Sequence, residues 1–261
     1  MDSLETPVDP ATLPPVIQPP RPPRIWKFWG TLLWGLFVFA AMFAGQLAVV
    51  AWLVLRQGWP IDVAAAVRVL GGGLAISLSV IMGLPAVLAA LWVAIRPSHT
   101  PFADYLALRR PSWRQFLVGV VGLFVVVMGW DLISRLTGRE VQPGFMGDVL
   151  KSAQADGAMW LLVVAFCIAA PITEEFFARG FLYRGWSESF LRPIGAIILS
   201  SLVWTGLHLQ YDWFFLGEVF SIGLLFGYLR YRSGSIWLTV ILHGLNNLAA
   251  VVQTLLLAGS N

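Results

Sequence analysis

Long apolar stretches dominate the chain from about residue 25 onward, and most charged residues lie between them. The stretches 30–55 and 69–95 contain no Asp, Glu, Lys or Arg. A helix rises about 1.5 Å per residue and the hydrocarbon core of a bilayer is about 30 Å thick, so about 20 apolar residues can cross it. The pattern predicts seven spans: 30–55, 69–95, 116–133, 157–173, 193–210, 213–228 and 236–257.

Pro171 interrupts the fourth predicted span and removes one backbone hydrogen bond, which leaves a break of that span into two pieces open. We therefore predict an all-α fold, a polytopic transmembrane bundle of seven or eight helices with a buried polar active site. Eight of the first 24 residues are proline, so this segment is expected to be a disordered tail. The predicted organisation is a Pro-rich tail (1–24), N-terminal transmembrane helices and loops (25–156), a polar C-terminal transmembrane core (157–251) and a C-terminal end (252–261).

The composition supports a membrane location. The chain is 58% hydrophobic and 12% charged, whereas a soluble domain has about a quarter charged residues. Its single cysteine, Cys167, excludes an internal disulfide and a cysteine-based metal site. If the predicted spans cross the membrane in turn, twelve of the 17 Lys and Arg residues lie on the same side of the membrane as the N-terminus and five lie on the opposite side. Because Lys and Arg are enriched on the cytoplasmic side, this count predicts a cytoplasmic N-terminus. The compact length favours a prokaryotic plasma membrane. The net charge of +3 does not indicate a nucleic-acid partner, because Lys and Arg in a membrane protein first reflect its topology.

Two adjacent acids, Glu174 and Glu175, end the fourth apolar run. Residues four apart share a helix face, so Glu175 is predicted to pair with Arg179 and to hold the helix in place. Glu174 points to a different side of the helix and lacks such a partner. An unpaired carboxylate inside the membrane suits a general base.

Two of the three histidines in the chain, His208 and His243, also fall inside predicted spans, whereas His99 lies in a basic loop. Trp204 precedes His208 by four residues and Asn247 follows His243 by four, so each pair shares a helix face. Ionisable groups inside a membrane mark functional sites by default. Structural or gate-lining roles are expected for two further acids within spans, Asp131 and Glu218.

Three short motifs follow in order along the C-terminal part of the chain. EEFFAR begins at Glu174 and matches EExxxR, WTGLH ends at His208 and matches [F/W]xxxH, and HGLNN begins at His243 and matches HxxxN. With these motifs the chain resembles the CPBP family, which comprises type II CAAX prenyl endopeptidases and Abi-like bacterial intramembrane proteases. The resemblance covers residues 157–251. The chain departs from it at Trp204, where phenylalanine is more usual.

The resemblance implies an intramembrane endopeptidase that needs no cofactor. It implies a peptide or protein substrate, of which a prenylated C-terminus is one candidate, in contact with membrane lipid and without a nucleic-acid partner. It also implies roles for seven residues: water activation by Glu174 and His208, oxyanion stabilisation by His243 and Asn247, and support of the site by Glu175, Arg179 and Trp204.

Other hypotheses remain open at this point. Glu174, His208 and His243 form a His₂Glu set that can bind zinc and leave one position for water. A non-catalytic membrane binding or immunity protein is an alternative. A transporter is a further one, although the sequence shows no repeated halves.

A simple serpentine path also places His208 far from the other candidates, because fifteen residues from Pro193 span roughly 22 Å. Convergence therefore requires helices that tilt, start deeper or break. Gly206 and Gly244 are predicted to allow close helix approach beside the two histidines.

Overall fold

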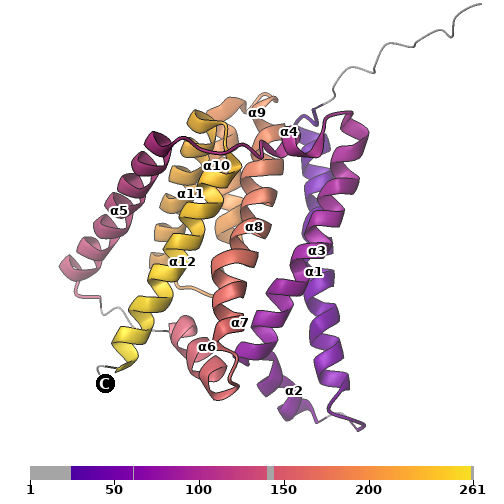
Figure 1. Ribbon diagram of the computed structural model, residues 1–261, viewed down its shortest axis with the longest axis vertical. Coiled ribbons are helices and arrows are strands. Elements are labelled where there is room, and N and C mark those ends of the chain that lie inside the picture. Colours follow the sequence, from indigo (N-terminus) through magenta and orange to yellow (C-terminus); the bar gives the residue numbers. More distant parts are fainter. Residues whose placement is uncertain (1–24, 61, 140–143, 260–261) are drawn as a thin grey trace, which may run out of the picture.

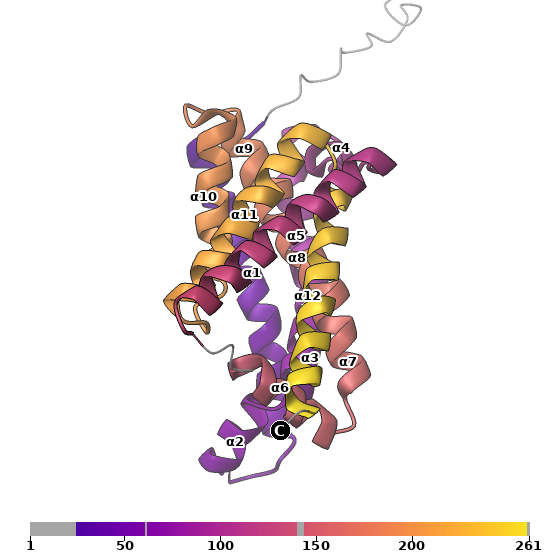
Figure 2. The same cartoon turned by 90° about the vertical axis from the view of Figure 1, so that its left-hand side faces the viewer.

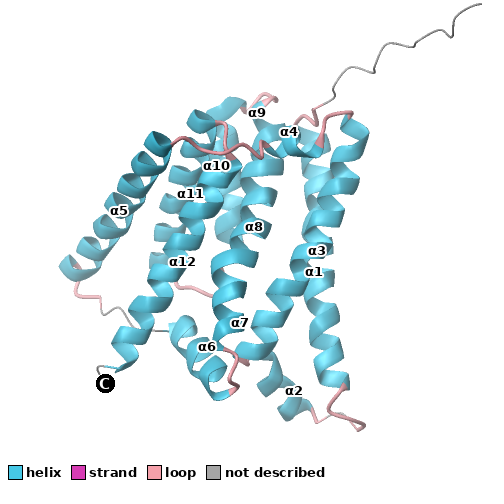
Figure 3. Ribbon diagram, in the orientation of Figure 1, coloured by secondary structure: helices cyan, strands magenta, loops and turns pink. Residues whose placement is uncertain are grey.

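Every regular element of the protein is a helix in the computed structural model, which describes residues 25–60, 62–139 and 144–259 (Figures 1 and 3). The predicted tail 1–24 lies outside these described residues. The α-helices are α1 (Phe28–Leu55), α2 (Val63–Leu70), α3 (Gly73–Ile95), α4 (Phe102–Leu106), α5 (Trp113–Leu136), α6 (Gly144–Ala155), α7 (Met159–Val164), α8 (Ala170–Glu175), α9 (Tyr183–Ser187), α10 (Arg192–Gly206), α11 (Trp213–Ser233) and α12 (Ile236–Gly259). A 3₁₀ turn, Arg96–Ser98, extends α3. Two π-helical segments, Ala165–Ala169 and Phe176–Leu182, join α7, α8 and α9 into one continuous helix.

Six helical stretches among the described residues are long and apolar enough to cross a membrane. They are Phe28–Leu55, Gly73–Ser98, Trp113–Leu136, Met159–Ser187, Trp213–Ser233 and Ile236–Leu257. The chain is thus an integral, multi-pass membrane protein with an all-helical fold. The predicted count of seven or eight is not confirmed. The fifth predicted span, 193–210, corresponds to α10, whose 15 residues are fewer than the about 20 that cross the hydrocarbon core.

The long helices lie roughly side by side, with α1 and α3 at one edge of the bundle and α5 at the opposite edge (Figures 1 and 2). The outer helices expose large apolar side chains, among them Leu33 at 66%, Trp113 at 68% and Phe124 at 62% exposure. Such surfaces would be costly in water but are compatible with lipid tails. Buried polar side chains between these edges include Glu175 of α8, Ser201 of α10, Arg230 of α11 and His243 of α12.

The length of the helix that carries Glu174 resolves the difficulty over His208. This helix continues to Ser187, thirteen residues or about 20 Å beyond Glu174, and α10 then covers about 22 Å along its axis, so Glu174 and the end of α10 reach a similar depth in the bundle. The chain turns after Gly206, and Asp212 then begins α11 by accepting hydrogen bonds from the backbone N–H groups of Phe214 and Phe215. His208 therefore lies in the turn between two helices rather than within a longer span.

Pro171 does not divide the fourth span, so the break that the sequence left open does not occur. The helix passes through the proline because the turn before it widens into the π segment, where the Ala170 N–H bonds the Ala165 carbonyl five residues back. The next bond of this pattern would join residue 171 to the Phe166 carbonyl, but proline has no N–H to donate. The Phe166 carbonyl is thus left for a partner from another helix. Such π segments frequently occur at functional sites.

Candidate active site

The carboxylate of Glu174 lies at the centre of a cluster contributed by three helices and the turn after α10. Its Oε2 accepts a hydrogen bond of 2.6 Å from the indole Nε1 of Trp204. The same oxygen lies 3.8 Å from Nε2 of His208 and 3.9 Å from Nε2 of His243. These two separations are too long for direct hydrogen bonds and short enough for one water molecule to contact both groups.

The second nitrogen of each imidazole is held by an oxygen that can only accept. Nδ1 of His208 lies 3.0 Å from the Trp204 carbonyl, and Nδ1 of His243 lies 3.2 Å from Oε1 of Glu175. Nδ1 must therefore carry the proton in both rings, because neither a carbonyl nor a carboxylate can donate. In the neutral rings Nε2 then presents its lone pair toward Glu174, and it becomes a donor only when a ring is protonated.

Glu175 and Arg179 form the ion pair that their four-residue spacing predicts. Arg179 donates to Oε1 of Glu175 at 2.9 Å, and both side chains are fully buried. The guanidinium also donates to the Gly223 carbonyl at 3.1 Å and lies 4.3 Å from the centre of the Trp204 ring. Because Oε1 of Glu175 also contacts His243, the pair positions this histidine as well as joining α8 to α11.

Asn247 has a structural contact that the sequence did not reveal. Its Nδ2 donates at 2.8 Å to the Phe166 carbonyl, the group that Pro171 leaves without a backbone partner. One turn earlier on α12, a Cβ at Gly244 would lie 2.6 Å from the Cys167 carbonyl, so the predicted close approach at Gly244 is confirmed. The corresponding prediction for Gly206 is wrong, since a Cβ at that position would meet nothing within 4 Å.

All four candidate catalytic side chains line one cavity of about 780 Å³ inside the bundle. Glu174 and His208 enter it at 18% and 16% side-chain exposure, whereas His243 is almost fully buried at 3%. The structure thus brings Glu174, His208, His243 and Asn247 to a common space, although the serpentine path places them apart.

Several other polar residues of the cavity wall were not singled out by the motifs: Gln46, Thr173, Gln210, Tyr211 and Asn246. The Tyr211 ring stacks on the imidazole of His208, with ring centres 6.2 Å apart. Burial raises the pKa of the Tyr211 phenol, and the nearby Glu174 carboxylate raises it further, so this group stays protonated at neutral pH. The stacking contact follows from the turn after α10, which the hydrophobic pattern did not indicate.

Trp204 contributes more than its place on the same helix face as His208 indicates. Its ring meets the imidazoles of His208 and His243 edge-on, with centre-to-centre distances of 4.9 Å and 5.3 Å. The hydrogen bond to Glu174 was missed, although a buried tryptophan usually finds a partner for its N–H. This general requirement was the one available signal, and it could not identify the acceptor.

The donor types for zinc are present, since the Nε2 atoms of His208 and His243 face an oxygen of Glu174. Each ring is also oriented through Nδ1 by an oxygen acceptor, as in many metal-bound histidines. Across the part of the chain that the structure describes, however, no group of three or more His, Cys, Asp or Glu side chains is arranged to hold a metal ion. Zinc binding at this site stays an alternative hypothesis that requires measurement.

Comparisons with known proteins agree with the motifs. Residues 156–249 match the family described as type II CAAX prenyl endopeptidase Rce1-like, which confirms the resemblance found in the sequence. The description of this family names an endopeptidase. The matched segment contains all four side chains that line the cavity as candidate catalytic groups.

An uncharacterised 24.3 kDa protein of Escherichia coli is 30% identical to the chain over 131 residues. The alignment covers 49% of this chain and 58% of that protein, so the chain spans less than two thirds of its relative. No solved structure matches the chain.

Proposed function

We propose that the protein is an intramembrane endopeptidase in which Glu174 and His208 activate a water molecule for attack on a peptide bond. The observation that carries the proposal is the placement of both imidazole Nε2 atoms within 3.9 Å of one Glu174 oxygen, at the wall of a cavity inside the bundle. A carboxylate and a neutral imidazole that share one water supply the acceptors needed to remove its proton. No side chain has to act as a nucleophile in this scheme.

In the proposed reaction, a water molecule between Glu174 and His208 gives one proton to the Glu174 carboxylate. The oxygen of the deprotonated water attacks the carbonyl carbon of the substrate. A tetrahedral intermediate forms, in which the former carbonyl oxygen is negatively charged. The proton held by Glu174 is then delivered to the leaving nitrogen as the C–N bond breaks. This returns the carboxylate and releases an acid and an amine, so that one water is consumed for each bond cleaved.

His243 and Asn247 are proposed to stabilise the negatively charged oxygen. His243 can donate through Nε2 only as a protonated ring, and the Glu175 carboxylate at Nδ1 stabilises that form, as the carboxylate does in serine protease triads. The amide of Asn247 carries two N–H groups, of which the bond to the Phe166 carbonyl uses one. The remaining N–H is available to a substrate oxygen in the cavity.

The proposal is tested by cleavage of peptides in detergent or liposomes by the wild type and by Glu174→Gln. Among the described residues Glu174 has no ion-pair partner closer than 3.8 Å, and its side chain is partly exposed, so the variant should unfold at nearly the wild-type temperature. Its turnover should be abolished, because glutamine cannot accept the proton. Normal cleavage by Glu174→Gln would show that the roles are wrongly assigned, and a wild type that cleaves nothing would favour a binding or immunity function.

A further inference from the structure

A second carboxylate, Glu218, lies in the cavity wall away from the proposed catalytic groups. It comes from the second turn of α11, and its neighbours Phe215, Val219 and Ile222 line the same cavity with apolar side chains. No hydrogen bond or ion pair joins the Glu218 side chain to any other described residue. A carboxylate in such an apolar wall is costly unless a cation or a hydrogen-bond donor meets it.

Apart from the two histidines of the proposed catalytic group, the ionisable side chains of the described cavity lining are acidic. The described lining includes three acids, Glu174, Asp212 and Glu218, and neither Lys nor Arg. Asp212 is already engaged, because it caps α11 and lies 3.8 Å from Arg139. Glu174 accepts the Trp204 N–H and faces the two histidines. Glu218 is therefore the carboxylate of this wall that is left for a ligand.

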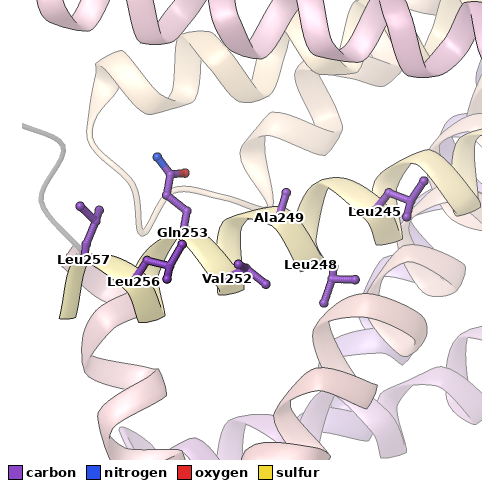
Figure 4. Close-up of a pocket in the computed structure, with 7 residues that line it drawn as sticks. All are labelled: Leu245, Leu248, Ala249, Val252, Gln253, Leu256 and Leu257. Carbon is purple, nitrogen blue, oxygen red and sulfur yellow. The ribbon is translucent and has the colours of Figure 1, made fainter. Parts of the chain in front are cut away.

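The shape of the cavity fits a length of polypeptide. Its lining follows α12 from His243 to Leu257, fourteen residues or about 21 Å, which equals about six residues of extended chain. The cavity adjoins an apolar groove on α12, with which it shares Ala249, Gln253 and Leu257. Figure 4 shows Gln253 and Leu248 pointing to opposite sides of this helix. The cavity thus extends from the candidate catalytic groups to the apolar surface of the bundle.

We propose that the cavity binds a substrate segment that carries a Lys or Arg residue, whose charged group pairs with Glu218. This inference rests on the proposed peptidase function for its link to cleavage. Phe226, whose ring lies 5.9 Å from that of His243, is eight residues from Glu218 on α11, or about 12 Å along the helix axis. An extended peptide rises about 3.4 Å per residue, so a distance of about 12 Å puts the basic residue about three or four residues from the bond that is cut.

Beside Glu218 a free terminal carboxylate would meet a like charge, and the described lining offers it no Lys or Arg. Substrate selection at Glu218 thus differs from recognition of a chain end. An internal basic segment and a free carboxyl end are two outcomes that a binding experiment can separate.

The test measures binding of fluorescently labelled apolar peptides of equal length that carry Lys, Ala or Glu at one position. The peptides are acetylated and amidated, and the protein is the full chain in detergent with Glu174→Gln to keep the peptides intact. The Lys peptide should bind at least about tenfold more tightly than the Ala peptide, the lower end of the effect of close charge pairs across an interface. Glu218→Gln should remove this preference, and Glu218→Lys should reverse it in favour of the Glu peptide.

Glu188→Gln is the matched control, since Glu188 is an exposed carboxylate outside the cavity and its loss should leave the preference intact. The inference is overturned if protein that retains Glu218 binds all peptides equally, or if the preference for the Lys peptide persists in Glu218→Gln. Tighter binding of the Ala peptide with a free carboxyl end than of its amidated form also overturns it. Cleavage is measured separately with Glu174 restored. A preference that follows Glu218 in a chain that cuts no peptide would refute the peptidase function and retain the cation-binding site.

Discussion

Replacing Glu175 by Gln should destabilise the protein far more than the same change at an exposed ion pair. Glutamine keeps an oxygen that can accept from both Arg179 and His243, so the change removes the charge and little else. Arg179 is fully buried and would retain an uncompensated positive charge. Breaking a buried pair in this way costs about 3–5 kcal/mol.

The chain provides a matched control for this prediction. Arg184 and Glu188 are also four residues apart, but they are 3.4 Å from each other and their side chains are 36% and 49% exposed. Solvent screens such a pair, so Glu188→Gln should change the free energy of unfolding by less than about 1 kcal/mol. Thermal unfolding in detergent, followed by the fluorescence of the 13 tryptophans, measures both variants. The melting temperature should fall on the order of 10 °C for Glu175→Gln and by a few degrees at most for Glu188→Gln.

A double variant separates the two contacts of Glu175. Glu175→Gln combined with Arg179→Met leaves no unpaired charge, and it should regain at least half of the lost stability because an apolar replacement of a buried pair is often well tolerated. Turnover should stay reduced by about 10²–10⁴-fold, since His243 still lacks its carboxylate. Equal destabilisation by Glu175→Gln and Glu188→Gln, or a double variant no more stable than the single one, would refute the buried-charge argument.

Two further predictions concern the fit of α12 against the π segment. Asn247→Ala should destabilise the protein by about 1–3 kcal/mol, because the Phe166 carbonyl loses its donor. The turnover of Asn247→Ala should fall by about 10²–10³-fold if the second amide hydrogen of Asn247 donates to the oxyanion. If added zinc restores the activity of this variant, and the wild type contains stoichiometric metal, the zinc mechanism is supported instead. Gly244→Ala should strongly lower the melting temperature, since the new Cβ would lie 2.6 Å from the Cys167 carbonyl, whereas Gly206→Ala should be tolerated because nothing lies within 4 Å. Similar melting temperatures for the two alanine variants would contradict the close-packing argument.

The sequence alone predicted those features that depend on a single helix. Apolar length indicated the all-helical membrane fold, and four-residue spacing indicated the contact between Glu175 and Arg179. The same spacing placed His243 and Asn247 on one face of α12, and both side chains reach the cavity. In each case one helix fixes the relative directions of the side chains, so no knowledge of the neighbouring helices is required.

Contacts between helices were not accessible in this way. The bond from Trp204 to Glu174 depends on how α10 is rotated against α8, and the hydrophobic pattern does not specify rotation inside a membrane where outer and inner faces are both apolar. The end of α10 at Gly206 was also missed, since the apolar run continues to Leu209 without a charged residue. The continuation of the fourth predicted span to Ser187 was missed as well, and it places Glu174 at the depth that His208 reaches.

Pro171 shows how a local irregularity can position residues that are far apart in the sequence. The sequence left a break at the proline open, but the π segment before it preserves the helix and leaves the Phe166 carbonyl without a backbone donor. Asn247 supplies that donor, and Gly244 allows α12 to approach the Cys167 carbonyl closely enough for the bond to form. His243 directly precedes Gly244 and shares a face of α12 with Asn247, four residues later. The side chain that is proposed to stabilise the oxyanion is therefore aligned with Glu174 by the backbone defect that the proline creates.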